Sequence, residues 1–149
     1  MPSFLVSLTR AQNELAHRVH DHIVELGLSV DEFLVIQLAL EDRARTAATI
    51  RRRLGLRQST FTSMVARLVG RGYLRTKPCP RDRRTRYLVP TLPGLMATRI
   101  ARSIHSELEA LATPHEVLDA YRTIERLGLL ISLLPEAERM DDGLPAVTA

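Results

Sequence analysis

The chain has 149 residues, of which 45% are hydrophobic, 26% charged and 4% aromatic, and it contains one cysteine. This length suits one domain with a sizeable core, so folding requires neither disulfides nor a structural metal. A single cysteine excludes an internal disulfide framework and a cysteine-based zinc cluster. No apolar run approaches the roughly 20 residues of a membrane span, and no secretory signal pattern is present. We therefore expect a cytoplasmic globular protein.

Positive charge is concentrated in one part of the sequence. Residues 43–86 contain 14 Lys and Arg residues against one acid, Asp82, which gives this segment a charge of +13. The rest of the chain carries −9, so the net charge of +4 conceals a basic block between acidic flanks. Such a block indicates a polyanion-binding module. An ordinary solvated surface would not explain the near absence of acids from it.

Apolar spacing and capping residues predict four helices in the first half of the chain. Ser29 and Glu32 form a capping-box pattern at the start of the second helix, and Thr46 is placed to cap the third. Glycines follow the first, third and fourth helices, where they favour termination. The expected helices span residues 3–26, 29–40, 46–54 and 58–69.

The pattern changes after residue 72. Residues 73–77 and 85–90 predict two short strands, joined by a loop of prolines and charged residues that is typical of an exposed hairpin. Thr113 and Glu116 form a second capping box, with proline at the first helical position. Two long helices are therefore expected over residues 91–111 and 113–135, followed by a frayed polar tail over residues 136–149.

The order of these elements is that of a winged helix-turn-helix. The predicted fold class is mainly α with a small β-hairpin. Residues 29–90 form the predicted DNA-binding lobe, and residues 3–28 and 91–135 form flanking helices. The segment 127–134 is apolar nearly all round, which requires burial on two sides. A core helix would satisfy this requirement, and so would a dimer interface, which we favour.

The outward face of the fourth predicted helix suits a DNA major groove. When Phe61, Val65 and Leu68 point inward, the outer positions carry small and hydroxyl side chains, with Arg67 at the margin and no carboxylate. Small residues let the backbone approach a groove, while Ser, Thr and Arg address base edges and phosphates. The alternatives are that Ser59 merely caps the helix and that the other hydroxyls are solvated.

The hairpin loop adds arginines that suit a minor groove, because narrow A·T-rich grooves attract arginine. Asp82 among them is compatible with DNA binding if it orients a neighbour through a charge-assisted hydrogen bond; otherwise it forms a surface ion pair. The candidate DNA-contacting residues are Arg52, Gln58, Ser59, Thr62, Ser63, Arg67, Arg75, Arg81, Asp82, Arg83 and Arg84.

Residues 57–94 resemble the DNA-binding segment of MarR-type (multiple antibiotic resistance) regulators. The run Ser-Thr-Phe-Thr-Ser-Met-Val-Ala-Arg-Leu at 59–68 is similar to the family's recognition helix, and residues 72–75 are similar to the entry to its wing. The segment 80–84 followed by 88–94 is similar to the wing signature, Asp-x-Arg and then leucine-threonine and glycine. Pro90 and Pro93 depart from this signature at the start of the following helix.

The resemblance implies a homodimer that binds a pseudo-palindromic DNA site. Its recognition helices would enter the major groove, with Arg84 in the minor groove and Asp82 as the orienting partner of Arg84. The resemblance further implies a repressor, without a cofactor, that is released by an oxidant or by a small, often phenolic or aromatic, effector. The candidate effector-lining residues are Phe4, Leu8, His17, Phe33 and Met96.

Two sensing hypotheses concern other residues. His17, His20 and His22, together with an acid, could bind a divalent metal in a metal-responsive regulator, although solvated imidazoles are the simpler interpretation. Cys79 lies between two prolines next to cationic residues, which favours its thiolate. We nevertheless expect Cys79 to be a solvent-exposed bystander.

Other classes of function are less compatible with the sequence than DNA binding is. Winged helices also bind proteins or double-stranded RNA, but the hydroxyl-rich helix face suits the DNA major groove and could not enter the narrow groove of A-form RNA. The sequence contains no His-Glu-x-x-His pattern, phosphate loop or nucleophile elbow, so we do not expect an enzyme.

Overall fold

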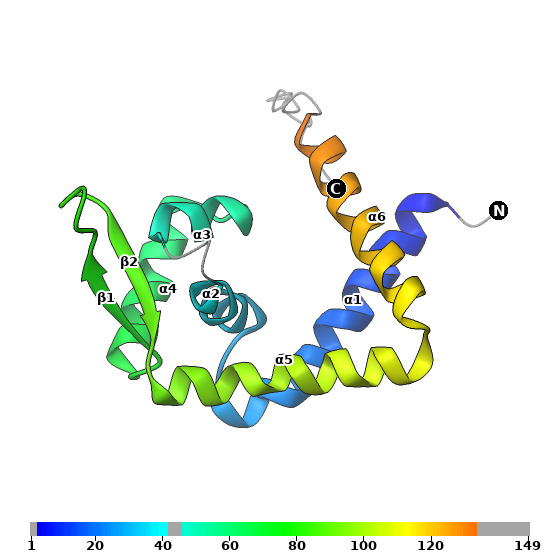
Figure 1. Cartoon of the computed structure of the whole chain (residues 1–149), viewed down its shortest axis with the longest axis horizontal. Helices are drawn as coiled ribbons and strands as arrows, with labels where there is room; N and C mark the ends of the chain where they lie inside the picture. Colours follow the sequence, from blue (N-terminus) through cyan, green and yellow to red (C-terminus); the bar gives the residue numbers. More distant parts are fainter. Residues whose placement is uncertain (1–2, 42–45, 134–149) are drawn as a thin grey trace, which may run out of the picture. The chain divides into compact units, whose positions relative to one another are not determined.

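A computed structural model describes residues 3–41 and 46–133 (Figure 1). The elements are, in chain order, α1 (Phe4–Ile23), the 3₁₀ helix η1 (Val24–Leu26), α2 (Val30–Leu40), α3 (Ala47–Arg53), α4 (Gln58–Gly70), β1 (Leu74–Pro78), β2 (Arg86–Pro90), α5 (Leu92–Leu111) and α6 (Pro114–Ser132). This helical architecture with one hairpin confirms the predicted fold class. The chain divides into two compact units after Glu107, within α5. Among the described helices, none is long and apolar enough to cross a membrane.

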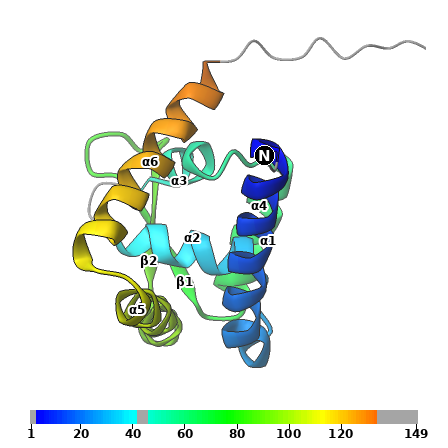
Figure 2. The ribbon, with the colours of Figure 1, turned by 90° about the vertical axis from the view of Figure 1, so that its right-hand side faces the viewer.

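The first unit has one core to which its helices and the hairpin contribute. Ile23 of α1, Ile36 of α2, Ile50 of α3 and Leu68 of α4 are fully buried, and they pack with Leu88 of β2. In Figure 2, α2 crosses α1 steeply and α5 is seen nearly end-on. Each element supplies one apolar face to this core, which leaves the polar faces of α3, α4 and the hairpin toward solvent.

The predicted helix starts are confirmed by their capping hydrogen bonds. At α2, the Ser29 hydroxyl accepts the N–H of Glu32 at 3.2 Å, and the Glu32 carboxylate accepts the N–H of Ser29 at 3.0 Å. Thr113 and Glu116 form the same reciprocal pair at α6. Thr46 caps α3 through its hydroxyl. These bonds satisfy N–H groups that the first helical turn leaves without partners.

The hairpin and the start of α5 lie close to their predicted positions. β1 and β2 pair antiparallel, with Leu74 opposite Pro90, and each strand begins one residue later than predicted. α5 begins at Leu92 because Thr91 acts as its cap and accepts the N–H of Gly94 at 3.3 Å. The prolines that depart from the family signature are compatible with this helix start, since proline is tolerated in a first helical turn.

The last helix, α6, leaves much of its apolar surface open to solvent, whereas α5 packs Ile100 and Ile104 against the core of the first unit. On α5 the buried residues are Gly94, Ala97 and Thr98, whereas Met96 is exposed. Leu134, Pro135 and the tail 136–149 lie outside the described residues. The large apolar side chains of α6 and its end that are more than half exposed are Tyr121, Ile124, Leu129, Leu130, Ile131 and Leu133.

Candidate nucleic-acid interface

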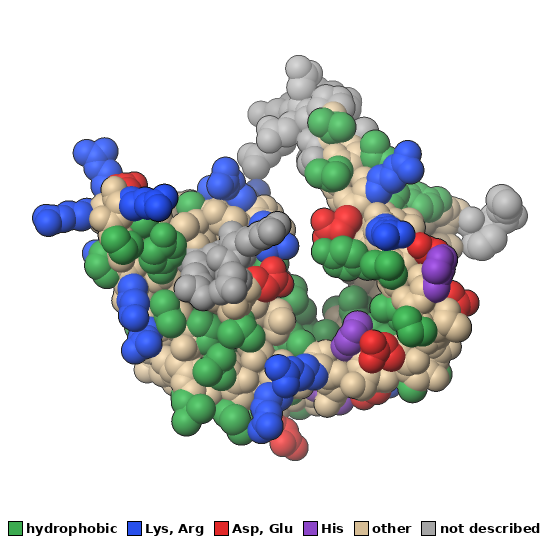
Figure 3. All heavy atoms as spheres, in the orientation of Figure 1, with side chains coloured by type: hydrophobic (Ala, Val, Ile, Leu, Met, Phe, Trp, Pro, Cys, Tyr) green, Lys and Arg blue, Asp and Glu red, His purple; other side chains and the backbone are tan. Residues whose placement is uncertain are grey.

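The side chains predicted to contact DNA come from α3, α4 and the hairpin, and all eleven are exposed. Figure 3 shows Lys and Arg side chains gathered over the hairpin and the helices beside it. Residues from all three elements, including Ala47, Gln58 and Arg84, line one hollow of about 230 Å³. The structure therefore brings the distant segments of the basic block to one surface.

The outward face of α4 is held in order by its own side chains. The Thr62 hydroxyl donates to the carbonyl oxygen of Gln58 at 2.8 Å and lies 3.2 Å from the Gln58 amide nitrogen. The residue before the helix is Arg57, which makes no side-chain capping bond, so Ser59 is not the cap. Phe61 is buried on the opposite face. The small and hydroxyl side chains of α4 thus face solvent, as the helical periodicity predicts.

The three arginines of α3 have different roles. Arg51 donates to the carbonyl oxygen of Leu56 at 3.2 Å, and Arg53 forms an ion pair with Glu41 at 2.8 Å. Arg52 lies between them, and its side chain has no partner among the described residues. Of the three, Arg52 is therefore the one available to a phosphate, consistent with its choice as the candidate.

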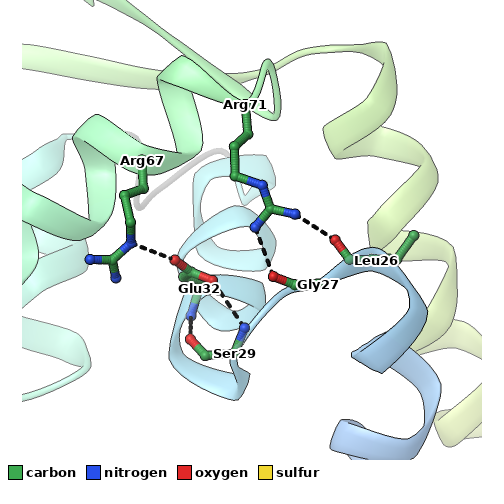
Figure 4. A network of polar contacts seen from close by, with 6 residues as sticks. All are labelled: Leu26, Gly27, Ser29, Glu32, Arg67 and Arg71. Carbon is green, nitrogen blue, oxygen red and sulfur yellow. Dashed lines mark hydrogen bonds and ion pairs between the residues drawn. The ribbon is translucent and has the colours of Figure 1, made fainter.

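Two arginines, one near the end of α4 and one just after it, are bound to the start of α2 and to the α1–α2 turn (Figure 4). The Nε of Arg67 donates to the carboxylate of Glu32 at 3.1 Å. The guanidinium of Arg71 donates to the carbonyl oxygens of Leu26 at 2.6 Å and Gly27 at 2.7 Å. Arg71 is thus engaged structurally, although the charge count places it in the basic block. No local pattern indicates these contacts, because they join residues that are distant in the sequence.

Asp82 shapes the tip of the hairpin. Its carboxylate accepts the backbone N–H of Arg84 and the hydroxyl of Thr85, each at 2.9 Å. These two bonds hold the pKa of Asp82 below its ordinary value. Among the described residues, Asp82 is bonded to the backbone of Arg84 and not to its guanidinium, and the role of Asp82 in orienting Arg84 for DNA stays a prediction. Arg81 and Arg83 flank Asp82, and both are exposed to solvent.

The position of Cys79 corrects the expectation of a solvent-exposed bystander, since this residue is only 8% exposed. Its backbone N–H donates to the carbonyl oxygen of Thr85, which extends the hairpin pairing beyond β1. Its Sγ lies 3.2 Å from the hydroxyl of Tyr87 and is hydrogen-bonded to it. This hydrogen bond, together with the backbone N–H of Arg81, lowers the pKa of the Cys79 thiol.

The predicted effector-lining residues are not brought together. Phe33 belongs to the core and is 2% exposed, because its helix turns this face toward the packed interior. His17 lines an open hollow along α1, and Met96 lines a different one between α2 and α5. Phe4 and Leu8 line neither of these hollows. The described part of the chain therefore contains no shared site built from these five residues.

The hollow between α2 and α5 places Met96 beside polar residues that no sequence pattern indicates. It measures about 790 Å³ and has Met96, Arg99 and Arg102 of α5 in its lining. Gln37 of α2 also lines it, and the buried Oε1 of Gln37 has no hydrogen-bond partner among the described residues. An amide acceptor beside two guanidinium groups suits a ligand that carries both a donor and an acid.

Within the described residues, the histidines of α1 belong to no group placed to hold a metal ion. Across residues 3–41 and 46–133, no group of three His, Cys, Asp or Glu side chains is placed to hold a metal ion. His22 lies 3.5 Å from the carboxylate of Glu107, and His17 lines the hollow on α1. The metal-responsive hypothesis therefore finds no assembled ligand set within the described residues.

Known proteins with similar sequences or folds are DNA-binding regulators or their relatives in the MarR family. The sequence model of the MarR family matches residues 26–85. No curated protein matches the chain. Together with the fold, the match defines a winged helix-turn-helix protein of the kind found in transcription regulators. The segment from the α1–α2 turn into the hairpin is therefore similar in sequence to the MarR family, and the described fold is similar to that of solved MarR structures.

Three solved structures show the extent of the likeness. Apo wild-type MarR from E. coli is 17% identical with a TM-score of 0.64, covering 85% of this chain and 98% of that one. CouR from Rhodococcus jostii RHA1, bound to p-coumaroyl-CoA, is 22% identical with a TM-score of 0.70, covering 84% and 90%. Reduced AbfR bound to DNA is 22% identical with a TM-score of 0.59, covering 83% and 91%. At these identities the likeness concerns the fold.

Proposed function

We propose that this protein is a dimeric, sequence-specific DNA-binding regulator of transcription that acts in the cytoplasm. The observation that carries the proposal is the single exposed surface formed by α3, α4 and the hairpin, with hydroxyl side chains on α4 and uncommitted arginines on both sides. A helix of small and hydroxyl residues suits a major groove, and the hairpin arginines suit the adjacent minor groove. Reduced AbfR, which has a similar fold, is bound to DNA in its solved structure, and this supports DNA as the partner.

The exposed apolar side chains outside the DNA-binding lobe support a homodimer. Tyr121, Ile124 and Leu129 of α6 are more than half exposed, as are Phe4 and Leu5 of α1. Apolar surface of this extent is expected to be covered by a partner. A two-fold dimer would present two recognition helices to half-sites about one helical turn, or ~10 base pairs, apart.

We further infer control by a small effector, with repression as the default state. The hollow between α2 and α5, at about 790 Å³, has the size of a small-molecule site. Arg99, Arg102 and the unpartnered amide oxygen of Gln37 favour an aromatic or phenolic acid over a neutral hydrocarbon. CouR, whose structure holds p-coumaroyl-CoA, provides a precedent within the same fold.

The test is selection of random duplex DNA on the purified full chain, followed by affinity measurements on the winners. We expect a two-fold symmetric site, and Arg84→Ala should weaken binding to that site by about 1–3 kcal/mol while leaving the dimer intact in sedimentation. Enrichment of no sequence would contradict the proposal. Selective binding of double-stranded RNA or of another protein would assign the basic surface to that partner instead.

A further inference from the structure

Arg67 differs from the other candidate DNA-contacting arginines because its side chain is held by a carboxylate. Its Nε lies 3.1 Å from Oε1 of Glu32, which is on α2. Oε2 of the same carboxylate accepts the N–H of Ser29 in the capping box of α2. Glu32 thus has a fixed position at the start of α2, and it reaches from there to the recognition helix (Figure 4).

The exposure of the two side chains is strongly unequal. The Glu32 side chain is 7% exposed, whereas that of Arg67 is 59% exposed. Among the described residues, the interactions of Arg67 involve Nε and leave its two Nη groups without partners. In Figure 4 these groups point away from Glu32. The buried carboxylate of Glu32 therefore holds the Nε end of the Arg67 guanidinium, and the two Nη groups, which form a fork of N–H donors, face solvent.

A second anchor fixes the helix that carries this fork. One turn after Arg67, the guanidinium of Arg71 binds the carbonyl oxygens of Leu26 and Gly27 and lies 5.2 Å from the centre of the Tyr73 ring. These carbonyls lie at the end of η1, where a cation is favoured. The end of α4 is thereby tied to the α1–α2 turn, so the Arg67 fork is fixed relative to the whole lobe.

We propose that Glu32 is a positioning residue that orients the Arg67 guanidinium so that its two Nη groups bind a DNA phosphate beside the recognition helix. The inference rests on the proposed DNA-binding function. Arg67 lies at the margin of the outward face of α4, past the small residues at its centre, which favours a backbone contact over a base contact. A planar guanidinium with both Nη groups free matches the bidentate geometry of phosphate.

The sign of one substitution tests the proposal. Glu32→Gln removes a negative charge near a polyanion, so electrostatics alone would tighten DNA binding. If Glu32 positions Arg67, the substitution should instead weaken DNA binding, and we expect affinity for the selected duplex to fall about fivefold. Glutamine retains an oxygen for the capping box, so α2 is preserved. Glu41→Gln is the matched control, since it makes the same charge change at the exposed partner of Arg53 and should leave binding equal or tighter.

A double-mutant cycle shows whether Glu32 acts through Arg67. Arg67→Ala should weaken binding to all duplexes alike and reduce the salt slope by about 0.9. In that background, Glu32→Gln should cause no further loss. Arg67→Lys keeps the charge without the fork and should resemble Glu32→Gln. As a readout without DNA, the Nε–H proton signal of Arg67 should be protected from exchange in the wild type and exposed in Glu32→Gln.

The outcomes separate this inference from the function on which it rests. A wild-type protein that binds no duplex selectively overturns the proposed function, and the inference with it. Wild-type binding with Glu32→Gln equal to or tighter than wild type overturns the inference alone. A loss that persists in the Arg67→Ala background does the same, because it assigns Glu32 to the fold. If Glu32→Gln does not fold, the DNA affinities of Arg67→Lys and Arg67→Ala test the phosphate contact instead. Affinities of both variants equal to that of the wild type would contradict this contact.

Discussion

The carboxylate of Asp82 accepts a hydrogen bond from the backbone N–H of Arg84 at 2.9 Å, two residues further along the hairpin tip. Its second oxygen accepts the hydroxyl of Thr85 at the same distance. Asp82 is the only acid in the basic block of residues 43–86. The bonds explain its presence, since they turn the backbone that carries the arginines Arg81, Arg83 and Arg84.

Replacement of Asp82 separates the effect of shape from the effect of charge. Asp82→Asn keeps one oxygen to accept the Arg84 N–H, and its amide NH2 can donate to the Thr85 hydroxyl. The variant should therefore bind the selected duplex as well as the wild type or slightly better, because a negative charge is lost. Asp82→Ala loses both hydrogen bonds and should weaken binding on the order of tenfold. Fluorescence anisotropy with a labelled duplex measures both. Equal weakening in the two variants would mean that the charge of Asp82, and not its acceptor geometry, is what matters.

The lowered pKa of Asp82 predicts the direction of a pH effect at the hairpin tip. Since the folded pKa lies below the ordinary value of 3.8, the ionised carboxylate stabilises the tip at pH above about 3.8. That stabilisation is lost as the pH falls through the lowered folded value. An NMR titration of the Asp82 carboxyl carbon should give a midpoint below 3.8.

The hydrogen bond from the Thr85 hydroxyl is the smaller of the two causes that lower the pKa of Asp82, and it can be removed separately. Thr85→Val deletes the hydroxyl donor but leaves the larger contribution, the backbone N–H of Arg84. The midpoint should therefore rise in the variant without reaching the ordinary value. A wild-type midpoint at or above 3.8 would contradict the hydrogen bonds at the tip.

The elements of the fold could be predicted because their signals are local. Capping boxes at Ser29 and Thr113 and the charged hairpin loop each involve residues a few positions apart, and their predicted bounds agree with the structure to within a few residues. The contacts of Arg71 join residues 44 and 45 positions apart, so they depend on the packed arrangement of α1 and α4. The burial of Phe33 likewise follows from packing.

The same distinction applies to the candidate interface. Helical periodicity correctly places Ser59, Thr62 and Ser63 on the exposed face of α4. Periodicity does not indicate which arginines are bound to other protein groups, since Arg53 and Arg67 find their carboxylate partners on other elements of the fold. The charge count therefore overstates the number of cations available to DNA.

Gly94 lies where the first turn of α5 meets the strand end, and an added side chain would disturb this junction. A Cβ at Gly94 would lie 2.2 Å from the backbone carbonyl oxygen of Tyr73, which cannot move independently. Gly94→Ala should lower the free energy of unfolding by about 2 kcal/mol or more. Gly70→Ala is the control, because a Cβ there meets no atom within 4 Å. Thermal and urea unfolding measure both, and similar stabilities for the two variants would refute the close contact.

Cys79 is expected to be inert in function despite its lowered pKa, because it is buried in the hairpin. Cys79→Ser should bind the selected duplex within about twofold of the wild type and keep its response to an effector. Tyr87→Phe should raise the pKa of Cys79, since the hydroxyl that stabilises the thiolate is removed. Thiolate absorbance as a function of pH measures this shift. Release of DNA by peroxide in the wild type, abolished in Cys79→Ser, would instead make Cys79 a redox switch.

The most direct test of the central claim is the affinity of the full chain for its selected duplex and for a scrambled duplex, measured at several salt concentrations. A dimeric regulator that reads sequence through the α3–α4–hairpin surface should bind the selected site at least about 10³-fold more tightly than the scrambled one, with a steep loss of affinity as salt increases. If the chain binds the selected and scrambled duplexes equally, and loses this binding as the salt concentration rises, the basic block serves non-specific association. The proposed function would then be wrong.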